Sequence, residues 1–311
     1  MISAVVPAFN EEESINEFYK VLSVNLVKLD KNYEIVFIDD GSTDSTLELL
    51  KQLALKDKAI RIFSFRKNRG KAEALTVGFQ MAKGDYIVTL DADLQDRPEE
   101  IGSLLKKSKE GFDLVSGWKK NRKDSFTSVV FSKFFNFVMS SFWGVHLHDY
   151  NCGLKLYTKD AAKSLNLYGG MQRFIPLLVA EKGFEVTEVP VVHEKRLYGK
   201  SKYGSLKIIT EMPDMFTILF LSKYAKRPLH FFGFVGGIVS AIGIFILLYL
   251  TVIHFMGQPI GERPLLIFGM LLLLAGLQVL FTGLLADLIL HISQKDHQSV
   301  NLNDGFKYKT E

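Results

Sequence analysis

The most informative chemical feature of this 311-residue chain is Asp91-Ala92-Asp93, which directly follows the apolar run 86–90. Two carboxylates spaced i, i+2 at the end of a strand can leave the sheet together and share one hard divalent cation. Mg²⁺ and Mn²⁺ prefer such oxygen ligands and also bind substrate phosphates. An isolated Asp-x-Asp is more often a solvated turn. The position after an apolar strand, with Gln95 and Asp96 following, favours a metal site at Asp91 and Asp93.

Two further polar segments follow predicted strands. Pro7-Ala8-Phe9-Asn10-Glu11 comes after the run 2–6, and Asp39-Asp40 comes after the run 34–38. In a parallel sheet ligands bind beyond the carboxyl ends of the strands, so we expect all three segments at one site. Asp39-Asp40-Gly41-Ser42 is also compatible with a turn and a helix cap. No glycine-rich dinucleotide loop or Walker loop follows the first strand, so a metal must neutralise bound phosphates.

Strands and helices alternate through the first part of the chain. Asn10 as N-cap, with Glu13 three residues later, predicts a helix that runs to about Leu29. Pro98 suits the first turn of a later helix. Further helices are predicted after Asp44, to near Leu55, and over 72–82. The predicted strands are 2–6, 34–38, 60–65, 86–90 and 114–116. The alternation predicts an α/β domain with a mostly parallel sheet covered on both faces.

Composition excludes some classes of protein. The formal net charge of +4 is too weak a bias for nucleic acid to be the main partner. The single cysteine, Cys152, permits no intrachain disulfide, which fits a reducing compartment. The N-terminus lacks the basic start and long apolar run of a signal peptide. We therefore expect the first domain to stay in the cytosol.

Two segments near the C-terminus predict membrane spans. Residues 231–253 and 265–286 contain no Asp, Glu, Lys or Arg, and each is long enough to cross a bilayer as a helix. Buried core helices are the alternative, but these segments lack a polar stripe. Lys226 and Arg227 precede the first span and Lys295 follows the second, which predicts that both termini are cytoplasmic.

The predicted organisation has four parts. Residues 1–202 form the catalytic domain, and 203–228 form amphipathic helices at the membrane surface. A helix packed on the catalytic domain is the alternative for the second segment. Residues 229–290 hold the two transmembrane helices, and 291–311 form a cytoplasmic tail.

Four segments carry a resemblance to a known family by their order and spacing. They are Val6-Pro7-Ala8-Phe9-Asn10-Glu11, Asp39-Asp40-Gly41-Ser42-Thr43-Asp44, Asn68-Arg69-Gly70-Lys71 and Leu90-Asp91-Ala92-Asp93-Leu94-Gln95-Asp96. They resemble family 2 glycosyltransferases with the GT-A nucleotide-sugar-binding fold. The closest branch is that of polyprenyl-phosphate (dolichol-phosphate-type) glycosyltransferases. The resemblance covers about residues 2–205, and the C-terminal spans resemble the membrane anchor of some members of that branch.

The resemblance implies roles on the donor side. Phe9 would stack near the nucleotide base and Asp40 would hydrogen-bond it. Asp93 would be the metal ligand that bridges the diphosphate, and Gln95 would lie near the sugar. The nucleotide site implied in this way comprises Pro7, Phe9, Glu11, Asp40, Lys71, Asp91, Ala92 and Asp93, with Asp91 facing either the ribose or the metal.

Two later segments match the acceptor side of the family. Asp149-Tyr150-Asn151-Cys152-Gly153-Leu154-Lys155 resembles an Asp-x-x-x-Gly-Phe-Arg stretch, in which Lys155 keeps the charge of the arginine but not its bidentate fork. Asp149 is a candidate base or orienting group. The segment 196–202 resembles a basic loop that suits a phosphate, although a solvated loop is the alternative. Candidate phosphate or acceptor residues are Lys155, Arg173, Arg196, Lys200, Ser201 and Lys202.

The resemblance implies an inverting transfer from a UDP- or GDP-linked sugar to a polyprenyl phosphate, with Mg²⁺ or Mn²⁺, at the cytoplasmic face of the cell membrane. The implied partners are the donor, the lipid acceptor and the membrane, with a homo-oligomer left open. One alternative is a hydroxyl acceptor in polysaccharide or glycolipid synthesis. Gln172-Arg173-Phe174 does not match the Gln-x-x-Arg-Trp motif of processive synthases. A non-catalytic membrane scaffold is the other alternative, disfavoured by the intact Asp91-x-Asp93 and the basic loop.

Overall fold

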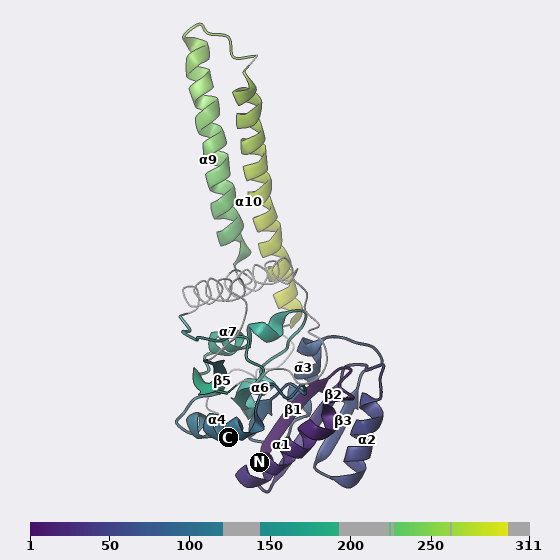
Figure 1. Ribbon diagram of the computed structural model, residues 1–311. Coiled ribbons are helices and arrows are strands. Elements are labelled where there is room, and N and C mark those ends of the chain that lie inside the picture. Colours follow the sequence, from purple (N-terminus) through teal and green to yellow (C-terminus); the bar gives the residue numbers. More distant parts are fainter. Residues whose placement is uncertain (121–143, 193–223, 225–226, 262, 298–311) are drawn as a thin grey trace. The chain divides into compact units, whose positions relative to one another are not determined.

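The computed structural model of the chain describes residues 1–120, 144–192, 224, 227–261 and 263–297 (Figure 1). Internal contacts divide the chain into two compact units, Met1–Met215 and Phe216–Glu311. Each unit is described by itself. Within the described residues, the first unit carries a sheet with helices and the second carries two long helices.

A seven-stranded sheet in the order β3-β2-β1-β4-β6-β5-β7 organises the first unit. The first four strands along the chain pair in parallel, as does β7 with β5, whereas β6 runs antiparallel to both of its neighbours. The predicted mostly parallel sheet is therefore confirmed. The strands are β1 Ile2–Ala8, β2 Tyr33–Asp39, β3 Ile60–Ser64, β4 Tyr86–Thr89, β5 Leu114–Lys119, β6 Lys155–Thr158 and β7 Val186–Val191.

Helices pack on both faces of the sheet, because side chains alternate along each strand. On one face, Phe18 and Leu22 of α1 are fully buried in the same cluster as Val6. On the other face, α3 lies so close to β1 that a Cβ at Gly78 would stand 2.2 Å from Val5 Cγ1. The helical segments are α1 Ile15–Leu29, α2 Thr46–Lys56, α3 Lys71–Met81, η1 Pro98–Glu100, α4 Ile101–Ser108, α6 Lys159–Lys163, η2 Met171–Arg173 and α7 Ile175–Glu181.

The predicted start of the first helix at Asn10 is wrong, since α1 begins at Ile15 after Ser14. Asn10 instead adopts a left-handed φ of 54°. Its side-chain Oδ1 accepts the backbone N–H of Thr43 at 2.9 Å, and its own N–H donates to Ser42 Oγ at 3.0 Å. Asn10 therefore joins the loops that follow β1 and β2, because its short polar side chain finds partners across the sheet edge rather than in its own helix.

The second unit contains α9, Pro228–Phe255, and α10, Pro264–His297. Both are long and apolar enough to cross a membrane, with mean hydropathies of 2.5 and 2.4 over their most apolar windows. Only 17% and 11% of those windows are buried, which is far less than expected for core helices. The predicted spans 231–253 and 265–286 lie within α9 and α10.

The predicted amphipathic segment 203–228 and the predicted tail 291–311 lie largely outside the described residues. Of the predicted amphipathic segment 203–228, only Tyr224, Arg227 and Pro228 belong to the described part of the chain. The predicted tail 291–311 begins as helix, because α10 continues to His297.

Candidate active site

The acidic turn, residues 91–96, leaves the sheet at the end of β4 as predicted. Asp93 and Asp96 are buried, with exposed fractions of 8% and 3%, whereas the Asp91 side chain is 37% exposed. Asp93 Oδ1 accepts the N–H of Gln95 at 3.2 Å. Leu94 has a left-handed φ of 60°, which is costly for a residue with a Cβ. The turn thus buries the carboxylates of Asp93 and Asp96 and leaves that of Asp91 exposed, in a strained backbone conformation of the kind that is common at functional sites.

Lys71 lies beside this turn as the first residue of α3. Its Nζ forms an ion pair with Asp91 Oδ1. The loop that carries Lys71 is fixed by Asp40, whose carboxylate accepts the N–H groups of Arg69 at 2.7 Å and Gly70 at 2.9 Å. Burial raises the pKa of Asp40, and these two N–H groups oppose that shift. Asp40 therefore positions Lys71, in addition to the contact with a nucleotide base that the sequence predicts.

Asp39 fits the turn interpretation that the sequence left open. Its Oδ1 accepts the N–H of Ser42 at 3.1 Å and its Oδ2 accepts the Ser64 hydroxyl at 2.6 Å. These contacts join the ends of β2 and β3. The two adjacent aspartates therefore have different structural roles. Asp39 closes a turn, and Asp40 binds the loop that leads to Lys71.

Asp149 lies before β6 and is only 3% exposed. Its Oδ1 accepts the N–H of Asn151 at 3.0 Å. Glu188 on β7 accepts the N–H of His148 at 2.8 Å and also pairs with the His148 ring, which stacks on Trp118 at 4.1 Å. Glu188 thereby ties the segment that carries Asp149 to the sheet.

A largely buried lysine that the sequence analysis missed lies beside the acidic turn. Lys119 Nζ is 3.5 Å from Asp96 Oδ1, and its side chain is 14% exposed. Burial by itself would lower the pKa of Lys119, but the charge of Asp96, supported by Asp149 and Asp91, raises it above its ordinary value. The signal was available, because extending the predicted strand 114–116 to Lys119 would have placed this ammonium at the functional edge.

Gly153 brings the acidic turn and the Asp149 segment into contact. A Cβ at this position would lie 2.7 Å from Asp96 Oδ2 and 2.8 Å from Asp91 Oδ2. Any side chain would displace both carboxylates. The two motifs, separated by about sixty residues in sequence, therefore form one site.

Lys155 is the first residue of β6 and is buried, with 3% of its surface exposed. Its ammonium donates to the carbonyl oxygen of Cys152. Burial lowers its pKa below the ordinary lysine value. Burial, followed by the charge of Asp96, raises the pKa of the Cys152 thiol to about 12, so this cysteine is an inert packing group.

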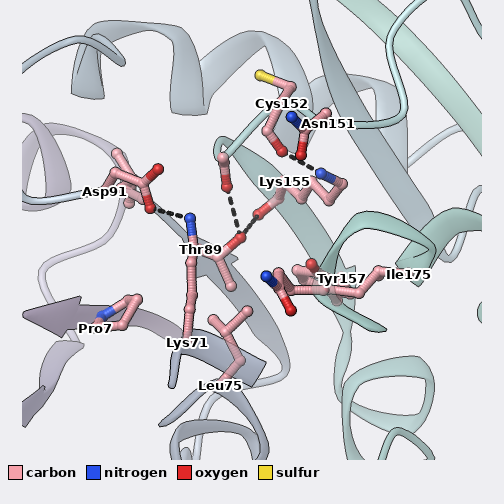
Figure 2. Close-up of a pocket in the computed structure, with 13 residues that line it drawn as sticks. Pro7, Lys71, Leu75, Thr89, Asp91, Asn151, Cys152, Lys155, Tyr157 and Ile175 are labelled. Atoms are coloured by element: carbon pink, nitrogen blue, oxygen red, sulfur yellow. Dashed lines mark hydrogen bonds and ion pairs between the residues drawn. The ribbon is translucent and has the colours of Figure 1, made fainter. Parts of the chain in front are cut away.

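A pocket opens beside Asp91, beneath the acidic turn (Figure 2). Its wall includes Thr89, whose hydroxyl donates to the Gly153 carbonyl at 2.9 Å. Residues of the N-terminal half of the sheet and of the segment 151–175 face each other across it. Among them are Pro7, Lys71, Asp91, Asn151, Lys155, Tyr157 and Gln172.

The remaining predicted residues fall into two groups. Phe9 and Glu11 are half-buried in the loop after β1, Ala92 is buried within the acidic turn, and Arg173 is half-buried in η2. The structure therefore gathers most predicted donor-side residues at one edge of the sheet. The predicted basic residues Arg196, Lys200 and Lys202, with Ser201, lie outside the described residues.

Carboxylates and lysines at the carboxyl ends of a mostly parallel sheet define a class of α/β proteins that bind phosphate-containing ligands there. The chain belongs to glycosyl transferase family 2, whose family model matches residues 3–165. It is therefore a glycosyltransferase, as the resemblance of its motifs implied.

Two groups of relatives extend the match to almost the whole chain. A dodecaprenyl-phosphate galacturonate synthase of Rhizobium johnstonii is 38% identical over 306 residues, which cover 96% of this chain and 90% of the relative. An undecaprenyl-phosphate 4-deoxy-4-formamido-L-arabinose transferase of Aeromonas hydrophila is 33% identical over 293 residues, covering 93% of this chain and 88% of the relative. The similarity thus includes the C-terminal unit as well as the sheet.

Solved structures show the same fold. Glucosyl-3-phosphoglycerate synthase of Mycobacterium tuberculosis matches with a TM-score of 0.52 and 24% identity, over 71% of this chain and 80% of that one. A mannosyltransferase of Pyrobaculum calidifontis, in complex with GDP-Man and Mn²⁺, matches with a TM-score of 0.51 and 20% identity, over 70% and 64% of the two chains. The GT-A fold implied by the motifs is confirmed.

Proposed function

We propose that this glycosyltransferase moves a sugar from a nucleotide-sugar to the phosphate group of a polyprenyl phosphate. The observation that carries the proposal is the acidic turn 91–96, which packs on Gly153 and is flanked by Lys71 and Lys119. Such a site suits a diphosphate leaving group on one side and an anionic acceptor on the other. The names of the relatives, which are polyprenyl-phosphate sugar transferases, support this choice of acceptor.

The residues present fit a divalent metal. Asp91 and Asp93 offer hard carboxylate oxygens at one strand end, and Mg²⁺ is commonly held by one or two carboxylates together with substrate phosphates. Within the described residues, no group of three or more His, Cys, Asp or Glu side chains converges on one point, which agrees with a site that the substrate completes. A bound Mg²⁺ or Mn²⁺ would stabilise the charge that develops on the departing nucleoside diphosphate.

The chain's own groups would then hold the donor. Phe9 and Pro7 would border the nucleotide base, and Lys71, tied to Asp91, would lie near the diphosphate. A solved relative holds GDP-Man with Mn²⁺ and another holds UDP-glucose with Mn²⁺, so the fold accommodates either base. The proposal accordingly leaves UDP and GDP as the two candidates.

On the acceptor side, a phosphate needs positioning rather than deprotonation. A phosphate monoester with a second pKa near 6 is already largely a dianion at pH 7. Lys119, and the basic residues Arg196, Lys200 and Lys202, would compensate that charge. Asp149 would orient the acceptor through the segment that Glu188 holds in place. A hydroxyl acceptor would instead require a carboxylate base, and the buried Asp149 is the observation that favours this second candidate.

We further propose that α9 and α10 cross the cell membrane and that the catalytic domain and both termini are cytoplasmic. Lys226 and Arg227 precede α9, and Lys295 lies in the last turn of α10, beyond its apolar part. A lipid-linked phosphate could then reach the site while its hydrocarbon tail stays in the bilayer.

The proposal is tested by incubating the detergent-purified full chain with a panel of UDP- and GDP-sugars and a short polyprenyl phosphate. We expect one nucleoside diphosphate released for each polyprenyl-phosphate-sugar, with the product identified by mass. A scaffold protein would release no nucleoside diphosphate from any donor, and that result would contradict the proposal.

A further inference from the structure

Two polar side-chain atoms of residues that line the pocket form no hydrogen bond of regular geometry within the described residues. They are the Tyr157 hydroxyl oxygen and the Gln172 side-chain oxygen, and both are buried. Tyr157 is fully buried on β6, where its ring packs against Phe79 with the ring centroids 5.0 Å apart. The hydroxyl of nearby Thr89 donates to the Gly153 carbonyl, and its weak contact with the Tyr157 hydroxyl opposes only part of the rise in the Tyr157 pKa that burial causes. Buried polar atoms without regular hydrogen bonds cost stability, so a bound polar group that completes their hydrogen bonds would stabilise the pair.

The position of the pocket along the sheet indicates which part of a donor would reach it. The strand order β2-β1-β4-β6 places Asp40 first, then Pro7, then Asp91 and finally Lys155. In a nucleotide-sugar the order is base, ribose, diphosphate and sugar. With the base near Asp40 and the diphosphate near Asp91, the sugar lies on the β6 side, where Tyr157 and Gln172 line the pocket.

The chemistry of the two atoms fits a hydroxyl group. The Gln172 oxygen can only accept a hydrogen bond, whereas the Tyr157 hydroxyl can donate or accept. A sugar hydroxyl can donate to Gln172 and accept from Tyr157 at the same time. Lys155 also lines the pocket. An ammonium has three N–H donors, so Lys155 can donate to an oxygen of the sugar while it donates to the Cys152 carbonyl.

We propose that this pocket receives hydroxyl substituents of the donor sugar, and that Tyr157 and Gln172 are specificity-determining residues for that sugar. The inference rests on the proposed function, because it takes the donor to be a nucleotide-sugar. A site that is built to hydrogen-bond a hydroxyl discriminates against donors that lack it, because its own polar atoms then stay unpaired.

The test uses Tyr157→Phe and Gln172→Leu in the full chain. Removing a polar atom that forms no regular hydrogen bond should leave the thermal unfolding temperature unchanged or slightly raised. Binding of the accepted nucleotide-sugar, measured by titration calorimetry, should weaken about two- to tenfold for each variant, the range expected for one hydrogen bond. Binding of the nucleoside diphosphate alone should stay at the wild-type value. Tyr86→Phe is the matched control, since Tyr86 lies at the opposite end of β4 and does not line the pocket.

The outcomes separate the inference from the proposed function. Equal weakening for nucleoside diphosphate and nucleotide-sugar, or wild-type binding of both by the two variants, would overturn the sugar pocket even if the wild type transfers sugar normally. A lower unfolding temperature for Tyr157→Phe would show that its hydroxyl serves the fold. Failure of the wild type to release nucleoside diphosphate from any donor would instead refute the proposed function.

Discussion

Asp93 is the side chain on which we expect the donor half of the proposed site to depend. It is buried beside the more exposed Asp91, and its Oδ1 accepts the N–H of Gln95 within the strained acidic turn. This hydrogen bond to the backbone fixes the rotamer of the Asp93 side chain and so the direction of its carboxylate. The local fold thus supplies the rigidity that a metal and a diphosphate require.

Asp93→Asn should therefore reduce sugar transfer by at least about 100-fold, the loss typical of removing one electrostatic stabiliser of the transition state. Asparagine keeps an acceptor for the Gln95 N–H, so the thermal unfolding temperature should stay close to that of the wild type. Wild-type activity should disappear in chelator and return with Mg²⁺ or Mn²⁺. The exposed Asp160→Asn on α6 serves as the control. Full activity of Asp93→Asn, or activity that is indifferent to chelator, would refute the metal assignment.

The sequence predicted the residues that stand in contiguous motifs and missed those that only the fold brings to the site. Asp91 and Asp93 follow a predicted strand, so their position at a strand end identified them, whereas Lys71 came from the resemblance of the segment Asn68-Arg69-Gly70-Lys71 to the family. Lys119 lies at the end of β5, just beyond the predicted strand 114–116. Glu188 acts through β7, whose pairing with β5 is not visible in any local pattern. The approach of Gly153 to two carboxylates likewise arises from tertiary contact.

Glu34 joins several elements of the sheet near the amino ends of the strands, away from the candidate site. Its carboxylate accepts the Ser3 hydroxyl at 2.6 Å, the Lys83 N–H at 2.6 Å and Arg61 Nη1 at 2.9 Å. One side chain on β2 therefore links β1, β3 and the turn before β4. Burial opposes ionisation, but these donors outweigh it and hold the pKa of Glu34 below its ordinary value.

Glu34→Gln should lower the free energy of unfolding by about 1–3 kcal/mol at pH 7, because charge-assisted hydrogen bonds are lost. A depressed folded-state pKa contributes stability above the unfolded value of about 4.3, and that contribution is lost as the pH falls through the folded-state pKa. The difference between wild type and variant should hence shrink below about pH 4. Unfolding temperatures measured across pH, with the exposed Glu48→Gln as control, test this. A difference that is independent of pH would contradict it.

The helices α9 and α10 contact each other through small residues. A Cβ at Gly276 would lie 2.3 Å from Ser240 Oγ, and a Cβ at Gly236 would lie 2.6 Å from the Gly276 carbonyl oxygen. Without a hydrophobic driving force in lipid, such close backbone approach is what holds a helix pair together.

We expect Gly276→Leu to separate the pair, whereas Gly237→Leu should be tolerated, because no atom lies within 4 Å of a Cβ at Gly237. The readout is the concentration of SDS at which the compact form of the full chain is lost on electrophoresis. Equal effects of the two leucines would show that α9 and α10 are not paired in this way.

The element boundaries that the sequence predicted were mostly close, and the exceptions have physical causes. The strand 2–6 extends to Ala8 and the strand 114–116 to Lys119, because pairing with neighbouring strands continues past the apolar run. The start of α1 moved from Asn10 to Ile15, since Asn10 hydrogen-bonds to the loop after β2. The antiparallel direction of β6 depends on the path of the whole chain, which periodicity does not encode.

At the scale of the whole molecule, a GT-A catalytic unit is followed by a unit of two apolar helices. Sequence similarity to polyprenyl-phosphate sugar transferases continues through both units. The proposed lipid acceptor would account for this architecture, because an enzyme that acts on a membrane-bound phosphate gains from being held at the membrane.

The proposed topology predicts that the connector between α9 and α10 faces away from the cytoplasm. Gly261→Cys in this connector should react with an impermeant maleimide in intact cells, whereas the exposed Lys58→Cys in the catalytic unit should react only after lysis. The native Cys152 is 1% exposed and should give little background. Labelling of Gly261→Cys only after lysis would show that the proposed topology is wrong, either because the orientation is reversed or because the helices do not span the membrane.

The central claim is that the acceptor is a lipid phosphate, and a matched pair of acceptors tests it most directly. The measurement is the rate of sugar transfer by the full chain to a polyprenyl phosphate and to the polyprenol of the same length, at pH 7 with the accepted donor. Loss of a dianion that several lysines compensate should reduce transfer to the alcohol by at least about 100-fold, equivalent to two charge-assisted contacts. Equal transfer to both, or transfer to the polyprenol alone, would contradict the account.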